Sequence, residues 1–156
     1  MSVLRYALYC GAGAALASTA ATMLSARAEG ESPWRPVNAT SHWLHGDAAG
    51  RRADPDLAHT GLGAATNVAA GMMWGGLFGA WLERRRSVSK AVVPGAAATG
   101  ALAAGLDYGL LPRRLSPGWE LALSPRSVGV SLAAMAAGMA AGGMAARAAE
   151  DRAHAG

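Results

Sequence analysis

Four long stretches of this 156-residue chain are almost free of charged side chains. Residues 6–26, 60–82 and 127–146 contain no Asp, Glu, Lys or Arg, and residues 91–112 contain only Asp107. Each stretch has roughly the 20 residues that an α-helix needs to cross a ~30 Å hydrocarbon layer. None shows the polar stripe, repeating every three or four positions, of a surface helix in a soluble protein. Helices are expected because backbone groups in lipid must be paired within the segment.

We therefore predict an all-α, polytopic transmembrane helical bundle that forms one integral membrane domain over residues 1–156. The outer loop, residues 27–59, is expected to hold a short interfacial helix. The alternative is a soluble, alanine-rich bundle, because Ala and Gly contribute little to membrane insertion. This weakness is greatest in the last stretch, which is mainly Ala, Gly and Met. The predicted spans are about 4–26, 60–82, 91–112 and 127–147.

The first predicted span has a competing interpretation. Met1 to Ala28 has a basic residue, an apolar run and the sequence Ala26-Arg27-Ala28, an arrangement that resembles a cleavable secretory signal. The apolar run is long for a signal, and an arginine between the two alanines fits a cleavage site poorly. We expect a retained first helix.

The basic residues predict the orientation. With four spans, both termini and the loop after the second span lie on one side, and that short loop contains Arg84 to Arg86 and Lys90. Lys and Arg near short loops favour the cytoplasmic side. We expect a multi-pass protein of the bacterial inner (cytoplasmic) membrane with cytoplasmic termini. Aromatic residues are then expected at the inner interface (Tyr6, Tyr9, Trp81) and the outer one (Trp34, Trp43, Trp119).

The overall charge does not indicate nucleic-acid binding. The formal net charge is +4, but the arginines lie in short clusters between apolar runs, and only 15% of residues are charged. This is typical of membrane flanks rather than of a basic nucleic-acid surface. The expected partners are the lipid bilayer and other membrane proteins or a second copy of the chain.

Glycines at four-residue intervals predict close helix packing. Gly63, Gly71, Gly75 and Gly79 are separated by multiples of four. Small residues at this spacing let helix backbones approach closely in a membrane. The same spacing occurs in Gly105 with Gly109 and in Gly138 with Gly142.

A group of polar residues is expected at the outer side: His42, His45, His59, Asn67 and Asp107. Asn38 or Thr40 is a candidate cap for a short helix that ends at Gly46. His42 and His45 would share one face of it, and a zinc site with His59 and a carboxylate is one interpretation. The other is a hydrogen-bonded network that fixes the outer loop to the bundle.

Single residues in this group also have alternatives. Asn67 is expected to hydrogen-bond a neighbouring helix. Asp107 either pairs with Arg113 or Arg114 or serves as a functional carboxylate. No HExxH, cysteine pair, nucleophile elbow, Walker loop or dinucleotide fingerprint occurs, so no catalytic residue, metal or cofactor is expected.

Three segments carry a resemblance. They read VNATSHWLHGD from Val37, HT at His59 and DYGLLPRRLSPGWE from Asp107. They resemble a family of small hypothetical inner-membrane proteins from Proteobacteria, a group with no assigned activity. The resemblance covers most of the chain and implies no site residue.

Three functions are compatible with these features. The first is a small, non-enzymatic membrane protein, structural or accessory to a membrane complex. The second is a transport or permeation subunit with a polar path near Asp107, Asn67 and His59. The third is a periplasm-facing membrane enzyme or metal-binding protein.

Overall fold

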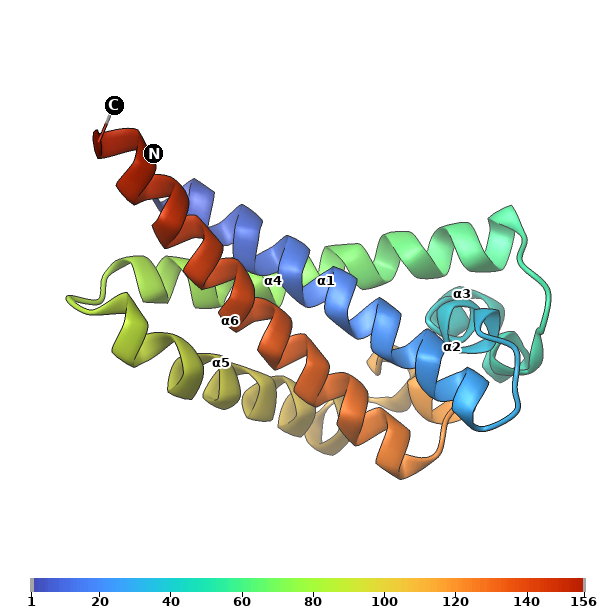
Figure 1. Ribbon diagram of the computed structural model, residues 1–156. Coiled ribbons are helices and arrows are strands. Elements are labelled where there is room, and N and C mark those ends of the chain that lie inside the picture. Colours follow the sequence, from blue (N-terminus) through green and yellow to red (C-terminus); the bar gives the residue numbers. More distant parts are fainter. Residues whose placement is uncertain (1, 156) are drawn as a thin grey trace.

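The computed structural model describes residues 2–155, which form an all-α helical bundle without strands. Its long helices run antiparallel in chain order. Figure 1 shows both termini and the α4–α5 turn at one end of the bundle, and the short helices at the other. This is the sidedness expected for an even number of long helices. The four long helices are α1 (Ser2–Ala28), α4 (Leu62–Glu83), α5 (Val88–Gly105) and α6 (Pro125–Ala155).

Short helical turns close the second end of the bundle. Prolines and glycines separate them: Pro33 precedes α2, Gly46 ends α3 with a positive φ of 72°, and Gly118 precedes η5 with a φ of 79°. The turns η2 and η3 have π-helical hydrogen bonding. We call residues 29–61 and 111–124 the end cap. The short elements are α2 (Trp34–Ala39), α3 (His42–His45), η1 (Asp47–Arg51), η2 (Leu57–Gly61), η3 (Leu106–Leu110), η4 (Arg113–Leu115) and η5 (Trp119–Leu121).

Glycines hold α4 directly against α1. A Cβ at Gly75 would overlap the Gly11 backbone, and a Cβ at Gly71 would lie 2.9 Å from the Ala15 Cα. A Cβ at Gly79 would lie 2.6 Å from the Tyr6 carbonyl carbon. The predicted packing role of Gly71, Gly75 and Gly79 is therefore confirmed, and α1 is the helix they pack against. Gly63 packs against α2 instead, where a Cβ would overlap the Val37 carbonyl oxygen.

The other two predicted glycine pairs differ in their packing. Gly138 and Gly142 press α6 against the opposite side of α1, where added Cβ atoms would overlap the carbonyl groups of Gly13 and Tyr9. In contrast, a Cβ at Gly105 or Gly109 would meet nothing within 4 Å, so the packing role predicted for this pair is wrong. Both lie where α5 ends and the π turn η3 leads away from the bundle core.

Each long helix overlaps one charge-free stretch, although α5 ends at Gly105 and α6 continues through Arg147 and Glu150. Only α1 and α6 are long and apolar enough to cross a membrane by length and composition among the described residues. Helix α4 contains Asn67, tryptophans and several glycines. The shorter α5 contains Lys90 and Pro94. Four qualifying spans were expected, and two are found.

Two aromatic residues expected at interfaces are buried within the bundle. Trp119, in the end cap, packs with Ala26, Leu123 and Val128. Tyr6 lies in the main core, where its hydroxyl donates a 3.4 Å hydrogen bond to Glu150. Each ring fills space between helices, and its depth relative to a membrane stays a prediction.

Candidate functional site

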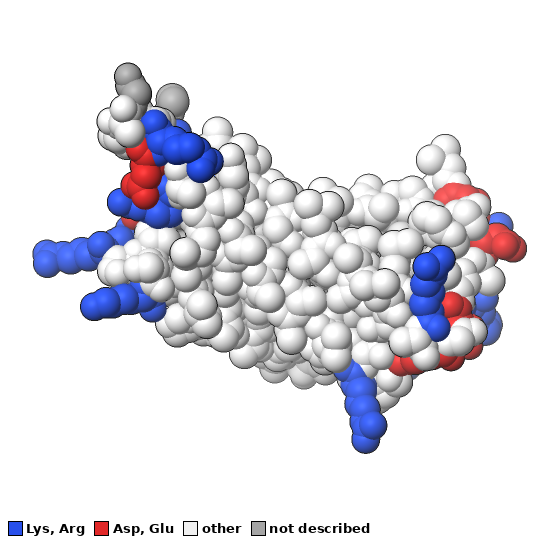
Figure 2. Space-filling model, viewed as in Figure 1, with Lys and Arg blue, Asp and Glu red and all other residues white. Residues whose placement is uncertain are grey.

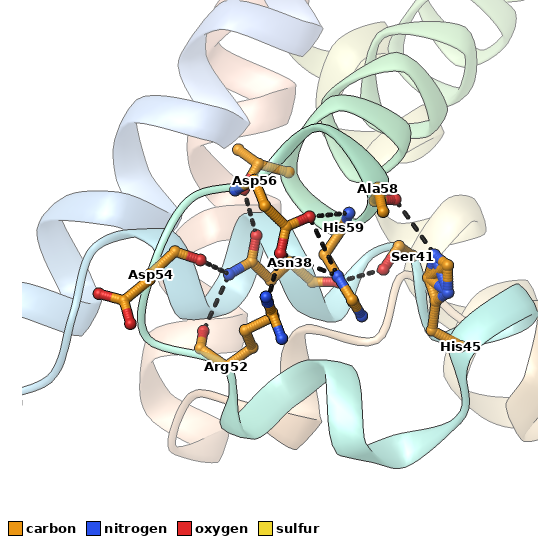
Figure 3. Close-up of polar contacts among 9 residues, drawn as sticks. Asn38, Ser41, His45, Arg52, Asp54, Asp56, Ala58 and His59 are labelled. Atoms are coloured by element: carbon orange, nitrogen blue, oxygen red, sulfur yellow. Dashed lines mark hydrogen bonds and ion pairs between the residues drawn. The ribbon is translucent and has the colours of Figure 1, made fainter.

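The end cap is organised around the buried side chain of Asn38. Its Nδ2 donates to the carbonyl oxygens of Arg52 (2.9 Å) and Asp54 (3.1 Å), and its Oδ1 accepts from the Thr60 hydroxyl at 2.5 Å. Figure 3 shows the amide of Asn38 between these segments. Asn38 caps no helix, contrary to one expectation. It joins α2 to the chain that enters α4.

His45 and His59 lie together beside Asp56. Their ring centroids are 4.2 Å apart, and the His45 Nε2 lies 3.1 Å from the Ala58 carbonyl oxygen. The His59 backbone N–H donates to Asp56 Oδ1 at 2.7 Å, while its ring Nδ1 lies 3.1 Å from the same carboxylate (Figure 3). Asp56 also pairs with Arg52. Asp56 thus caps the π turn η2 and orients the His59 ring.

These contacts favour the ionised form of the Asp56 carboxyl group. The hydrogen bond from the His59 backbone is the main cause that lowers the pKa of Asp56 from 3.8 to about 2, with further contributions from the His59 ring and Arg52. Donors favour the charged carboxylate because they stabilise its negative charge.

His42 occupies a separate, buried position. Its Nδ1 lies 3.1 Å from the Ala39 carbonyl oxygen and its Nε2 lies 2.9 Å from that of Arg113. A neutral imidazole has one N–H and can donate to one of these carbonyls, whereas a protonated ring donates to both. His42 therefore ties α3 to the 111–124 segment. It does not share a site with His45, although the two are three residues apart in α3.

The residues proposed as zinc ligands do not lie together in the structure. Both ring nitrogens of His42 face carbonyl oxygens, and the His45–His59 pair is bonded within the end cap. Across residues 2–155, no three His, Cys, Asp or Glu side chains are grouped to hold a metal ion. The contacts form a hydrogen-bonded network instead, which the Trp43 Nε1–H extends to the Thr66 hydroxyl of α4 at 3.2 Å.

Asn67 joins α4 to α1, as predicted for a polar residue within a helix interface. Its Nδ2 donates to the hydroxyl oxygens of Thr19 (2.7 Å) and Ser18 (3.4 Å). Both hydroxyls donate to the Ala15 carbonyl oxygen, so the Asn67 amide must present its NH₂ group to them. The Asn67 Oδ1 is left as an acceptor.

Asn67 and Asp107 line one cavity of about 180 Å³ between α4, α6 and the end cap. Its walls are mainly apolar, and its other polar lining residues carry hydroxyl groups. Asp107, on the π turn η3, is half-buried and forms no ion pair with Arg113 or Arg114 within the described part of the chain. The lining residues also include Ser18, Thr66, Trp74, Leu111, Leu115, Ser116, Trp119, Leu132 and Met135.

The five predicted residues therefore occupy three places. His45 and His59 are paired, His42 is apart from them, and Asn67 shares the cavity with Asp107. Glu120 is not among the predicted residues, yet its Oε1 accepts from the cavity-lining Ser116 at 2.6 Å. Its Oε2 is buried without a partner. The only sequence signal that links Glu120 to Ser116 is their spacing of four residues within one turn.

In comparisons with known proteins, no protein-family model, curated protein or solved structure matches the chain.

Proposed function

We propose that the chain is a small integral membrane protein with four transmembrane helices and a non-enzymatic, structural or accessory role in a membrane complex. One observation carries the membrane assignment: a band without charge lies between two charged ends. Figure 2 shows blue and red atoms gathered at the ends of the face in view and a white band between them. The order of charged and apolar layers is that of a protein in a bilayer.

The outward surface of the long helices supports this assignment. Only 33% of the apolar window of α1 and 39% of that of α6 is buried. Large apolar side chains are exposed on every long helix, for example Leu16, Leu77, Leu102 and Val130. A soluble monomer rarely exposes apolar surface over such an extent. Helices α4 and α5 would cross beside α1 and α6, which they contact.

The polar network supports the structural role. Asn38, His42, His45 and His59 have partners that join segments of the end cap to each other. Trp43 joins the cap to α4 through the Thr66 hydroxyl. A group held in this way stabilises the fold. We place the end cap on the periplasmic side of a bacterial inner membrane, because the basic α4–α5 loop favours the cytoplasm.

Membrane extraction tests the assignment. The full-length chain should stay in the membrane pellet after treatment with alkaline carbonate and enter solution only with detergent. Release by carbonate would contradict an integral protein. Chemical crosslinking in native membranes then tests the accessory role: we expect a crosslink to another membrane protein or a second copy, and a lone monomer would contradict it.

A permeation subunit is the second candidate, and the shared cavity is the observation that favours it. Asn67 and Asp107 line that cavity, whereas His59 does not, so the polar path would lack the histidine expected in it. Four short helices would have to assemble as an oligomer to enclose a pore. A pH-dependent flux in liposomes that is lost in Asp107→Asn would favour this candidate, and no flux would exclude it.

A further inference from the structure

The cavity beside Asp107 contains a carboxylate without a cationic partner. Ion pairs among the described residues include those of Arg35 with Glu31, of Arg52 and His59 with Asp56, and of Arg147 with Glu150 and Asp151. None reaches Asp107. A carboxylate among apolar side chains is costly unless a cation or hydrogen-bond donor meets it. The cavity thus has an unmet requirement for positive charge.

Neighbouring groups add to this requirement. The Asn67 side chain uses its NH₂ group on α1 and keeps its carbonyl oxygen as an acceptor. The Ser116 hydroxyl also lines the cavity, and its hydrogen is used on Glu120, which leaves its oxygen as an acceptor. A ligand rich in donors would satisfy these acceptors.

The cavity adjoins an apolar groove between α4 and α5. Trp74 lines both spaces, and the groove, of about 300 Å³, continues past Phe78 to Trp81 on α4. Its α5 side consists of Gly95, Ala98, Thr99 and Leu102. Figure 1 shows α4 and α5 spreading apart from their shared turn toward the end cap.

The cavity and the groove together extend over about the thickness of one leaflet. Asp107 and Gly95 are 12 residues apart, which at 1.5 Å per residue is about 18 Å along the helix axis. One leaflet of a ~30 Å hydrocarbon core is about 15 Å thick. The rim of the cavity is apolar and exposed, with Met73 52% and Leu111 42% accessible. The opening therefore faces the surface that we assign to lipid.

We propose that the Asp107 cavity and the α4–α5 groove together bind one phospholipid with a primary ammonium headgroup, such as phosphatidylethanolamine. The ammonium meets the Asp107 carboxylate, and its remaining N–H groups reach the oxygens of Asn67 and Ser116. An acyl chain follows the groove from Trp74 to Trp81. This inference rests on the proposed membrane location, because the lipid reaches the groove from the surrounding leaflet.

An ammonium lipid fits this site better than a metal ion. Divalent cations require several oxygen ligands, and no group of three acidic or histidine side chains is present in residues 2–155. A lipid headgroup without a cationic group would leave the Asp107 carboxylate without a positive partner. Three N–H donors match the scattered acceptors, and Trp74 and Trp119 line the same cavity, where aromatic faces favour cations.

Native mass spectrometry of the full-length chain in mild detergent tests the proposal with three probes. These are phosphatidylethanolamine, its N-acetylated form and phosphatidylglycerol, all with identical acyl chains. The N-acetylated form removes the positive charge at the amine. We expect phosphatidylethanolamine to bind at least tenfold more tightly than the other two, and Asp107→Asn to reduce that preference to less than threefold. Asp47→Asn, an exposed carboxylate of the end cap, is the matched control and should keep the preference.

A second variant tests the groove. Ala98→Trp would fill the space between α4 and α5 and should weaken phosphatidylethanolamine binding, while leaving Asp107 unchanged. Equal binding of the three lipids to the wild-type chain would overturn the proposal, whatever the variants do. That result would leave the membrane assignment intact, because the assignment depends on carbonate extraction.

Discussion

At the scale of single residues, the strongest structural demand falls on Asn38. Its side chain is completely buried and satisfies two backbone carbonyls and one hydroxyl of residues 52–60. Asn38→Ala would leave these groups without partners, and each buried unsatisfied group costs ~1–3 kcal/mol. We expect a loss of about 2–4 kcal/mol in the free energy of unfolding, measured by denaturant titration in detergent micelles. Asp47→Ala, on the exposed surface of the same cap, should change it by less than ~0.5 kcal/mol. Equal effects of the two changes would contradict this role.

Asp56 should make the stability of the folded chain fall in acid. The lowered pKa means that the folded state favours the ionised carboxylate. The contribution of Asp56 is therefore complete above its ordinary pKa of 3.8 and is lost as the pH falls toward about 2. Thermal unfolding of the wild-type chain should shift to lower temperature between pH 4 and pH 2. Asp56→Asn should show a smaller shift over this interval, and an identical shift in both proteins would contradict the assignment.

Residue identities could be selected from the sequence, but their partners could not. Asn67 was expected to bond another helix, and it does, since a polar amide within an apolar stretch has few other solutions. His42 and His45 were grouped by their spacing alone. Their separation depends on the Arg113 carbonyl, which is 71 positions away along the chain from His42. Local spacing contains no information about such a contact.

At the scale of helices, adjacent glycines in α4 provide a matched pair. Gly75 faces the α1 backbone, whereas a Cβ at Gly76 would have the Ala7 Cβ, at 4.0 Å, as its nearest neighbour. Gly75→Ala should separate α4 from α1 and reduce the free energy of unfolding by roughly 1–3 kcal/mol, as overpacking does. Gly76→Ala should be neutral or stabilise by up to ~1 kcal/mol, because alanine favours a helix. Denaturant titration of both variants tests this. A destabilised Gly76→Ala with an unaffected Gly75→Ala would contradict the observed packing.

The charge pattern predicted the positions of the long helices. The glycine spacing predicted which helix faces pack together only in part. The charge-free stretches located all four long helices, because charges concentrate where helices end. The four-residue glycine spacing identified packing faces on α4 and α6 but failed at Gly105 and Gly109, which lie at the π turn. An extra residue per turn rotates the chain beyond it. A periodicity based on regular helix geometry cannot anticipate this change.

At the scale of the whole molecule, the arrangement of the ends constrains the topology. The N-terminus, the C-terminus and the α4–α5 turn share one end, and the end cap forms the other. If the bundle crosses a bilayer, these two ends lie on opposite sides. The end with the termini carries Arg84 to Arg86 in a short loop and Lys90 at the start of α5, which favours the cytoplasm, so the end cap should face outward.

Single-cysteine labelling of intact cells tests this orientation. Replacement of the buried Cys10 by alanine gives a background without thiols, since Cys10 is the only cysteine. Ala48→Cys in the end cap, Ser89→Cys at the start of α5 and Ala153→Cys near the C-terminus all lie at exposed positions. A membrane-impermeant maleimide should label Ala48→Cys in intact cells and the other two only after permeabilisation. Different labelling of Ser89→Cys and Ala153→Cys would contradict the shared end of the bundle. Exchange of the two patterns would preserve the bundle and reverse its orientation, which would show that the basic loop does not determine the topology.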